Sequence, residues 1–132
     1  MIFVDSGAWY ASAVPDDRDY DAARSWFHAN REPLVTTDYV VDELLTLFKT
    51  RGEFQRCFEW GRQLLEERIA QLEWVCPADV QRAWILFSTH TDKQWSFTDC
   101  VSRVVMDRLQ IKTAFAFDDH FRQFGDVTVV PA

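Results

Sequence analysis

The sequence predicts an α/β fold of three layers, in which a five-stranded, mostly parallel sheet is flanked by helices. Short apolar segments with strand character alternate with longer helix-like segments, and this order is typical of a parallel sheet covered on both faces. The 132 residues are 48% apolar and include only four Gly and four Pro, as expected for a compact, helix-rich protein. Without a linker or repeat, we expect one domain over residues 1–132.

The expected elements follow in order along the chain. The apolar segments predict strands over residues 2–4, 34–36, 73–76, 113–117 and 127–130. The intervening segments predict helices over residues 6–13, 17–30, 39–50, 53–70, 78–90, 98–109 and, briefly, 119–124. The helices before and after Gly52 follow one another without a strand, which predicts a helical hairpin inserted between two strands.

Charge and cysteine content narrow the classes of function and the location. Twenty-one acidic residues against 14 basic ones give a net charge of −7, which argues against a broad basic surface for nucleic acid. No apolar segment approaches the roughly 20 residues of a membrane span, and no basic region precedes the first apolar residues, as a signal peptide would require. The three cysteines are widely spaced and form no CxxC pair. We therefore expect a cytoplasmic protein with reduced thiols and no membrane partner.

Carboxylates follow two of the expected strands directly. Asp5 follows the first strand, and Asp118, with Asp119 beside it, follows the fourth. Ligands of parallel α/β sheets bind at the carboxyl ends of the strands. An aspartate at a helix start is also a good N-cap, so each of these residues has a structural role as an alternative.

Glu43 interrupts an apolar helix face. Helical spacing places it with Tyr39, Val40 and Leu47, whereas its neighbour Asp42 falls on a polar face. A buried carboxylate costs several kcal/mol unless it is neutralised, paired or bound to a cation. Three interpretations fit this pattern: a functional acid, a buried salt bridge to a distant arginine, or a boundary residue whose tip reaches water.

Asp99 lies at the start of the late helix. Ser96 and Asp99 have the spacing of a capping box, and Arg103 lies four residues after Asp99, within reach of an ion pair. A purely structural role is therefore an alternative for this acid as well.

Together, Asp5, Glu43, Asp99 and Asp118 have positions from which they can converge at one edge of the sheet. Clustered carboxylates raise one another's pKa values unless a cation lies between them. A ligand set of oxygens alone favours Mg²⁺ or Mn²⁺ over zinc. Such a site is suited to activating water against a phosphodiester.

These residues resemble the motifs of PIN-domain ribonucleases and, within them, of VapC-like toxins of type II toxin–antitoxin systems. The resemblance covers essentially the whole chain and is carried by Phe3-Val4-Asp5-Ser6, Val41-Asp42-Glu43-Leu44, Ser96-Phe97-Thr98-Asp99 and Ala116-Phe117-Asp118-Asp119-His120-Phe121. It implies a Mg²⁺-dependent endoribonuclease that hydrolyses RNA phosphodiester bonds. Its metal ligands and catalytic acids would be Asp5, Glu43, Asp99 and Asp118.

The resemblance also implies supporting residues and partners. Ser6 matches the small hydroxyl residue that follows the first acid, and Asp119 remains an alternative to Asp118. Ala116 departs from the family, many members of which carry Thr or Ser there. The implied partners are an RNA substrate, a cognate antitoxin and a second copy of the chain, in a homodimer or a toxin–antitoxin hetero-oligomer. His120 is a candidate for the pocket rim, and Lys49 and Arg51 are candidates for phosphate contacts.

Two other classes of protein remain as alternatives. A phosphoacceptor signalling domain has a similar length and an acidic Mg²⁺ site, but it would carry paired acids after the first strand and a lysine after a late one. This chain has a single Asp5, and Lys112 precedes its strand. A non-catalytic interaction protein with a PIN-like fold would keep the architecture without the activity. We expect each of the six tryptophans in the core rather than at an antitoxin interface, which is the alternative for some of them, and Trp95, just before Ser96, is the one to check for exposure.

Overall fold

The computed structural model describes residues 1–132 and contains a parallel sheet of five strands. The strands are β1 (Ile2–Val4), β2 (Leu34–Thr37), β3 (Gln71–Glu73), β4 (Thr113–Phe115) and β5 (Thr128–Val130). Their order is β3-β2-β1-β4-β5, and every neighbouring pair is parallel. From β1 the chain adds β2 and then β3 on one side of the sheet, and later adds β4 and β5 on the other side of β1. The strand order reverses between β1 and β4, the position at which open α/β sheets form their ligand sites.

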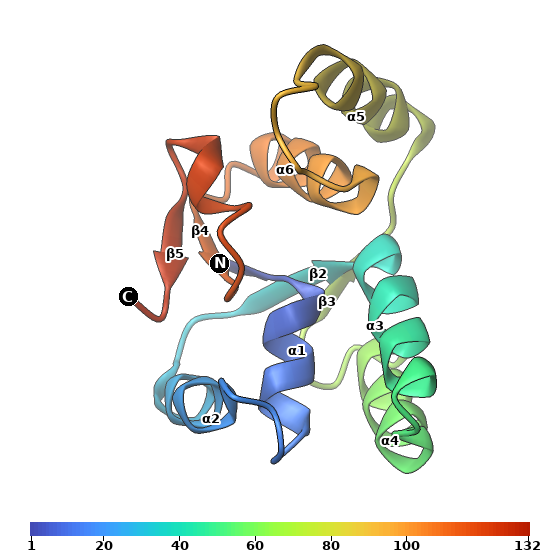
Figure 1. Ribbon diagram of the computed structural model, residues 1–132, viewed down its shortest axis with the longest axis vertical. Coiled ribbons are helices and arrows are strands. Elements are labelled where there is room, and N and C mark those ends of the chain that lie inside the picture. The colour runs from blue at the N-terminus through green and yellow to red at the C-terminus, as the bar shows by residue number, and fades with distance from the viewer.

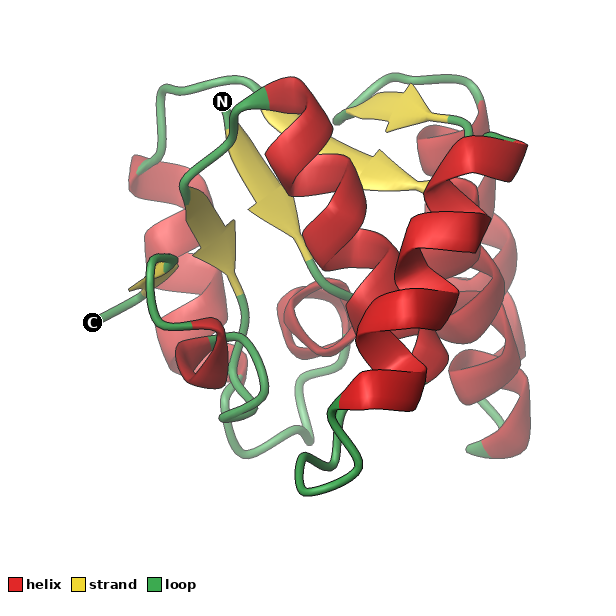
Figure 2. Cartoon of the chain, turned by 90° about the horizontal axis from the view of Figure 1, so that it is seen from above, coloured by secondary structure: helices red, strands yellow, loops and turns green.

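Helices cover both faces of the sheet (Figure 1). The helices are α1 (Ser6–Ala13), α2 (Tyr20–Ala29), α3 (Asp38–Thr50), α4 (Phe54–Leu65), α5 (Pro77–Thr89) and α6 (Phe97–Leu109). The pair α1 and α2 lies on one face, and the pair α5 and α6 lies on the other. The pair α3 and α4 forms the predicted hairpin, inserted between β2 and β3. Figure 2 shows the strands side by side between these helices. The three-layer fold predicted from the sequence is confirmed.

Two apolar clusters hold the layers together. The larger one contains 25 buried residues and joins the sheet to α1 and α3, with Phe3, Trp9 and Phe115 fully buried at its centre. The smaller one contains six buried residues and joins α5 to α6, with Trp95 between them. The sheet, α3 with Glu43 and α6 with Asp99 are therefore all held by well-packed apolar contacts.

Several predicted elements differ from the structure at their ends, and the helix predicted over 17–30 is α2 at Tyr20–Ala29. The strand predicted over 73–76 is β3 at Gln71–Glu73, because the following backbone N–H groups bind side chains: Val75 donates to Asp38 Oδ1 at 2.8 Å. The helix predicted over 53–70 ends at Leu65, because Glu67 has a left-handed φ of 55°. The helix predicted over 119–124 is only a short 3-10 turn, Arg122–Phe124.

The tryptophan prediction is wrong at two positions. Trp74 and Trp84 are 64% and 59% exposed, whereas Trp9 and Trp95 are buried. Trp74 lies just beyond the shortened β3, and Trp84 lies on the outer face of α5. None of the helices is both long enough and apolar enough to cross a bilayer.

Candidate active site

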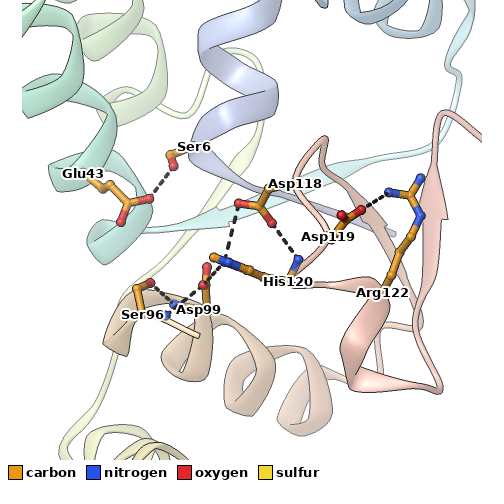
Figure 3. Close-up of polar contacts among 8 residues, drawn as sticks. All are labelled: Ser6, Glu43, Ser96, Asp99, Asp118, Asp119, His120 and Arg122. Atoms are coloured by element: carbon orange, nitrogen blue, oxygen red, sulfur yellow. Dashed lines mark hydrogen bonds and ion pairs between the residues drawn. The ribbon is translucent and has the colours of Figure 1, made fainter. Parts of the chain in front are cut away.

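Four separate elements bring the predicted acids to the carboxyl ends of β1 and β4. Figure 3 shows three of these acids, Glu43, Asp99 and Asp118. Asp5 follows β1, Glu43 lies on α3, Asp99 lies in the first turn of α6 and Asp118 lies in the loop after β4. The negative charges of Asp99, Asp118 and Glu43 each raise the pKa of Asp5. The four carboxylates therefore share one electrostatic environment at the point where the strand order reverses.

Asp5 is the most deeply placed of the four. Its residue is 3% exposed, and its Oδ1 has no hydrogen-bond partner. Burial is the main cause that raises the pKa of Asp5 well above the ordinary value of 3.8, and the three neighbouring carboxylates add to the rise. Asp5 occupies the N-cap position of α1, but its side chain makes no capping hydrogen bond. The capping role considered from the sequence is therefore not what holds this carboxylate.

Asp99 has both a structural contact and a contact within the site. It completes the predicted capping box: Ser96 N–H donates to Asp99 Oδ2 at 2.9 Å, and Asp99 N–H donates to Ser96 Oγ at 3.0 Å. The same Oδ2 lies 2.7 Å from His120 Nδ1. Burial raises the pKa of Asp99, while the Ser96 N–H and His120 oppose that rise. The expected ion pair with Arg103 is absent, because Arg103 binds Asp107 and Asp126 instead.

Glu43 faces the site from α3, as its helical position predicted. It is half-buried, and Ser6 Oγ, at the first residue of α1, donates a hydrogen bond to Glu43 Oε1. Asp42 is exposed, in agreement with the predicted polar face. The turn from β1 into α1 therefore provides both the buried Asp5 and the hydroxyl that orients Glu43.

The structure distinguishes Asp118 from Asp119. Asp118 Oδ1 accepts a hydrogen bond from the His120 N–H at 3.0 Å, and its charge acts on both Asp5 and Asp99. Asp119 is turned away from these acids toward Arg122, whose Nη1 lies 3.5 Å from Asp119 Oδ1 (Figure 3). Asp118 lies three residues beyond the end of β4, because that strand ends at Phe115 rather than 117.

His120 has a larger part in the site than its sequence position indicated. Its Nδ1 lies 2.7 Å from Asp99 Oδ2 and 3.7 Å from Asp118 Oδ2, so the imidazole lies between two of the acids (Figure 3). From the sequence, His120 is expected only at the rim of the pocket, two residues after Asp118. The contact with Asp99 joins α6 to the loop after β4 and is visible only in the folded chain.

The residues fit a divalent cation by charge and donor chemistry. The unpartnered Asp5 Oδ1 is a buried oxygen among three further carboxylates, and every acid in the set offers the hard oxygen ligands of Mg²⁺ or Mn²⁺. No three Asp, Glu, His or Cys side chains are placed closely enough to enclose a metal ion. A closed cage is not needed, since Mg²⁺ usually keeps several waters and binds one or two carboxylates together with substrate phosphate.

Two arginine side chains line a hollow that Asp118 also lines. It measures about 370 Å³ and is lined by Gly7, Tyr10, Asp17, Arg18, Asp19, Leu47, Arg51, Phe117 and Asp118. The Arg51 guanidinium lies over the Tyr10 ring, 4.8 Å from its centroid, which is a favourable cation–π arrangement. Lys49 instead lines an apolar groove between α3 and α4. Of the two predicted phosphate contacts, only Arg51 lies beside the acids.

Comparisons with known proteins agree on one family. Residues 2–127 match the PIN domain family model. The 23S rRNA-specific endonuclease VapC20 of Mycobacterium tuberculosis, from strains CDC 1551 / Oshkosh and ATCC 25618 / H37Rv, is 32% identical over 133 residues, which cover 99% of each chain.

Solved structures show the same relationship. A crystal structure of Mycobacterium tuberculosis VapC20, described as a sarcin–ricin loop cleaving toxin, has a TM-score of 0.92 at 27% identity and covers 99% of this chain and 100% of its own. The structure of FitAcB from Neisseria gonorrhoeae has a TM-score of 0.67 at 14% identity, over 98% and 96% of the two chains, and shares the fold. The chain is therefore a member of the PIN domain family, with VapC20 among its relatives.

Proposed function

We propose that this protein is a divalent-metal-dependent endoribonuclease of the VapC type, with Asp5, Glu43, Asp99 and Asp118 as its metal-binding and catalytic acids. The observation that carries the proposal is Asp5. A buried carboxylate with an unpartnered oxygen and three acidic neighbours is unfavourable by itself, and a bound cation relieves both costs. Membership of the PIN domain family and the similarity to a 23S rRNA-specific endonuclease support the reaction class.

The chain's own residues hold and orient the site. A divalent cation, when bound, lowers the pKa of an attacking water and stabilises charge on the phosphate. Asp5 would hold it from the end of β1, with Asp99, Glu43 and Asp118 around it. Ser6 orients Glu43, and the Ser96 N–H and His120 fix Asp99 Oδ2. We propose Mg²⁺ as the cation, with Mn²⁺ as an alternative, because the predicted ligands are all oxygens.

The substrate proposal follows the relative with the known target. VapC20 is a 23S rRNA-specific endonuclease and shares 32% of its residues with this chain over nearly the whole length of both. We propose RNA as the substrate, with large-subunit ribosomal RNA as the first one to test. This function fits a cytoplasmic protein, and the three cysteines are all free. Residues 1–132 would act as one domain, because the acids come from positions 5 to 118.

A cognate antitoxin is the proposed protein partner, within a homodimer or a toxin–antitoxin hetero-oligomer. An apolar groove of about 500 Å³ lies between α3 and α4, with Leu45, Phe58 and Leu65 among its lining residues. Phe58 and Leu65 are 61% and 52% exposed, which is unusual for a surface without a partner. The two charged residues that line this groove, Lys49 and Arg62, are both basic, which favours a partner segment that combines apolar side chains with acidic ones there.

Cleavage of RNA by the purified protein, free of any partner, tests the proposal. Protein incubated with 23S rRNA and with short single-stranded RNAs should cut with Mg²⁺ and not with EDTA. Asp5→Ala and Asp99→Ala should each lower the rate at least 100-fold, a loss of about 2.7 kcal/mol or more in transition-state stabilisation. Exposed Asp42→Asn is the matched control. Equal rates for wild type and Asp5→Ala would exclude this site as the source of cleavage.

Metal binding is measured separately from cleavage. Glu43→Gln should weaken Mn²⁺ binding, followed by calorimetry or electron paramagnetic resonance, by about 10-fold or more. Asp42→Asn should leave it unchanged, since its side chain is exposed on the other face of α3. Equal losses in both variants would contradict the placement of Glu43 at the cation.

A further inference from the structure

A second hollow, entirely polar, opens on the other side of His120. It measures about 480 Å³ and is lined by Asp92, Lys93, Gln94, Asp119, His120 and Gln123. One wall is the loop between α5 and α6, and the other is the segment that follows Asp118. Because the His120 ring also contacts Asp99 at 2.7 Å, a single side chain separates this hollow from the acids. A group bound here would be the immediate neighbour of a phosphate bound at the acids.

Aromatic packing beneath the hollow holds its two walls together. Trp95 follows Gln94 in the first wall, and Phe124 follows Gln123 in the second; their rings lie 4.7 Å apart. Trp95 is only 8% exposed. Arg103 lies over the other contact ring, 5.5 Å from the Phe124 centroid. The ring contact therefore joins the backbone segments of the two walls in the folded chain.

The lining chemistry selects a nucleobase rather than a phosphate. Asp92 lies 3.9 Å from Lys93, and Asp119 lies 3.5 Å from Arg122, so each cation already has a carboxylate partner and the hollow offers a phosphate no surplus positive charge. The Gln94 and Gln123 side chains are exposed, and no hydrogen bond within the chain engages either amide. Carboxylates accept hydrogen bonds and amides both donate and accept. The edge of an unpaired base offers this combination of groups.

We infer that this hollow is a base-recognition site, which binds an unpaired guanine of the RNA beside the cleaved phosphodiester. The inference rests on the proposed function. Guanine is the base that presents two adjacent N–H donors, from N1 and N2, to one carboxylate, while its O6 accepts from an amide. The His120 ring is available for stacking against the base. Cleavage would then depend on the identity of one nucleotide at a fixed distance from the cut.

Mapping of cut sites in a random-sequence RNA pool with Mg²⁺ tests this inference. Wild type should show guanine enriched about 10-fold at one fixed position, as a good bidentate contact provides. Gln94→Ala, Gln123→Ala and Asp92→Asn should each reduce that enrichment to about threefold or less, with preferences at other positions retained. Gln81→Ala, an exposed glutamine on α5 away from the hollow, is the matched control. Cuts that show no base preference, or variants that keep it, would overturn the inference.

A binding measurement separates this inference from the proposed function. Fluorescence anisotropy in EDTA compares labelled UUUGUUU with UUUUUUU, so that no cleavage is needed. Wild type and Gln81→Ala should each bind UUUGUUU about 10-fold more tightly than UUUUUUU. Gln94→Ala should bind the two RNAs with nearly equal affinity. If wild type cuts no RNA but shows this pattern, the proposed function fails and the base site stands. Equal affinities of wild type for both RNAs would overturn the base site.

Discussion

Asp5 dominates the energetics of the site at the scale of single residues. Its carboxylate is buried, one oxygen has no partner, and three other acids face it. The charged form is therefore disfavoured in the folded chain relative to the unfolded one, where water surrounds the group. Burial raises the pKa of Asp99 as well, so its charged form is also disfavoured in the folded chain. Without a cation, these two carboxylates work against folding at neutral pH.

The stability of the metal-free protein should reflect this cost. Because the pKa of Asp5 is raised in the folded state, the free energy of unfolding should fall as pH rises from the ordinary value of 3.8 through the raised one, and stay low above it. Asp5→Asn should therefore stabilise the protein at pH 7 in EDTA by at least about 1 kcal/mol, because it removes the buried charge and its repulsion by three carboxylates.

Urea unfolding at pH 4 and pH 7 measures this difference. The gain from Asp5→Asn should shrink at pH 4, where more of the wild-type carboxyl is protonated. Asp42→Asn should change neither value, since its side chain is exposed. A destabilised Asp5→Asn at pH 7 would show that the carboxylate is favourably held without metal.

At the scale of elements, an ion-pair cluster anchors the helix that carries Asp99. Arg108 on α6 donates to both carboxylate oxygens of Asp79 on α5, at 2.9 and 2.8 Å, and to Glu73 Oε1 on β3 at 2.9 Å. Asp79 is fully buried, and hydrogen bonds from Arg108 hold its pKa below the ordinary value. One guanidinium thus joins a strand and two helices behind the site.

Arg108→Met should cost about 3–5 kcal/mol, because it leaves the Asp79 charge buried without its partner. The double variant Arg108→Met/Asp79→Leu should recover part of that loss, since an apolar pair replaces the ionic one while the Cys76 N–H loses its Asp79 partner at the start of α5. Arg82→Met, at an exposed arginine of α5, is the control. Chemical denaturation measures all three. The contribution of the wild-type pair should be present above pH 3.8 and lost as pH falls below it.

The elements also show how far the sequence alone leads. Local periodicity and capping chemistry predicted α1, the Ser96 capping box and the inward face of Glu43, because each depends on neighbouring residues. The ends of β3 and α4 depend on groups that the sequence does not place. Asp38, distant in sequence, captures the Val75 N–H. His120 reaches Asp99 across two elements by the same kind of long-range contact.

At the scale of the whole molecule, the net charge of −7 does not show how acidic and basic side chains are distributed over the surface. The acids lie at the carboxyl ends of the strands, and Arg18 and Arg51 line the hollow beside Asp118. Composition alone argued against a broad basic surface, and it carries no information on where the few arginines lie. The fold places two of them where an RNA strand would approach the site.

Arg51→Gln should weaken RNA binding and reduce the slope of log affinity against log salt by about one, as expected for one lost phosphate contact. Filter binding or anisotropy across a range of salt concentrations measures both. Arg31→Gln is the matched control, because Arg31 precedes β2 and so lies at the opposite end of the sheet. An unchanged slope for Arg51→Gln would place the RNA backbone elsewhere.

The reversal of strand order between β1 and β4 also sets the earliest time during synthesis at which the four acids can come together. The strand at the centre of the sheet is made first, yet its neighbour β4 and the loop with Asp118 come roughly 110 residues later. At ribosomal rates of about 5–20 residues per second, roughly 5–20 s separate Asp5 from Asp118. A growing chain on the ribosome carries at most three of the four acids throughout that interval, so the site cannot assemble before Asp118 has been made.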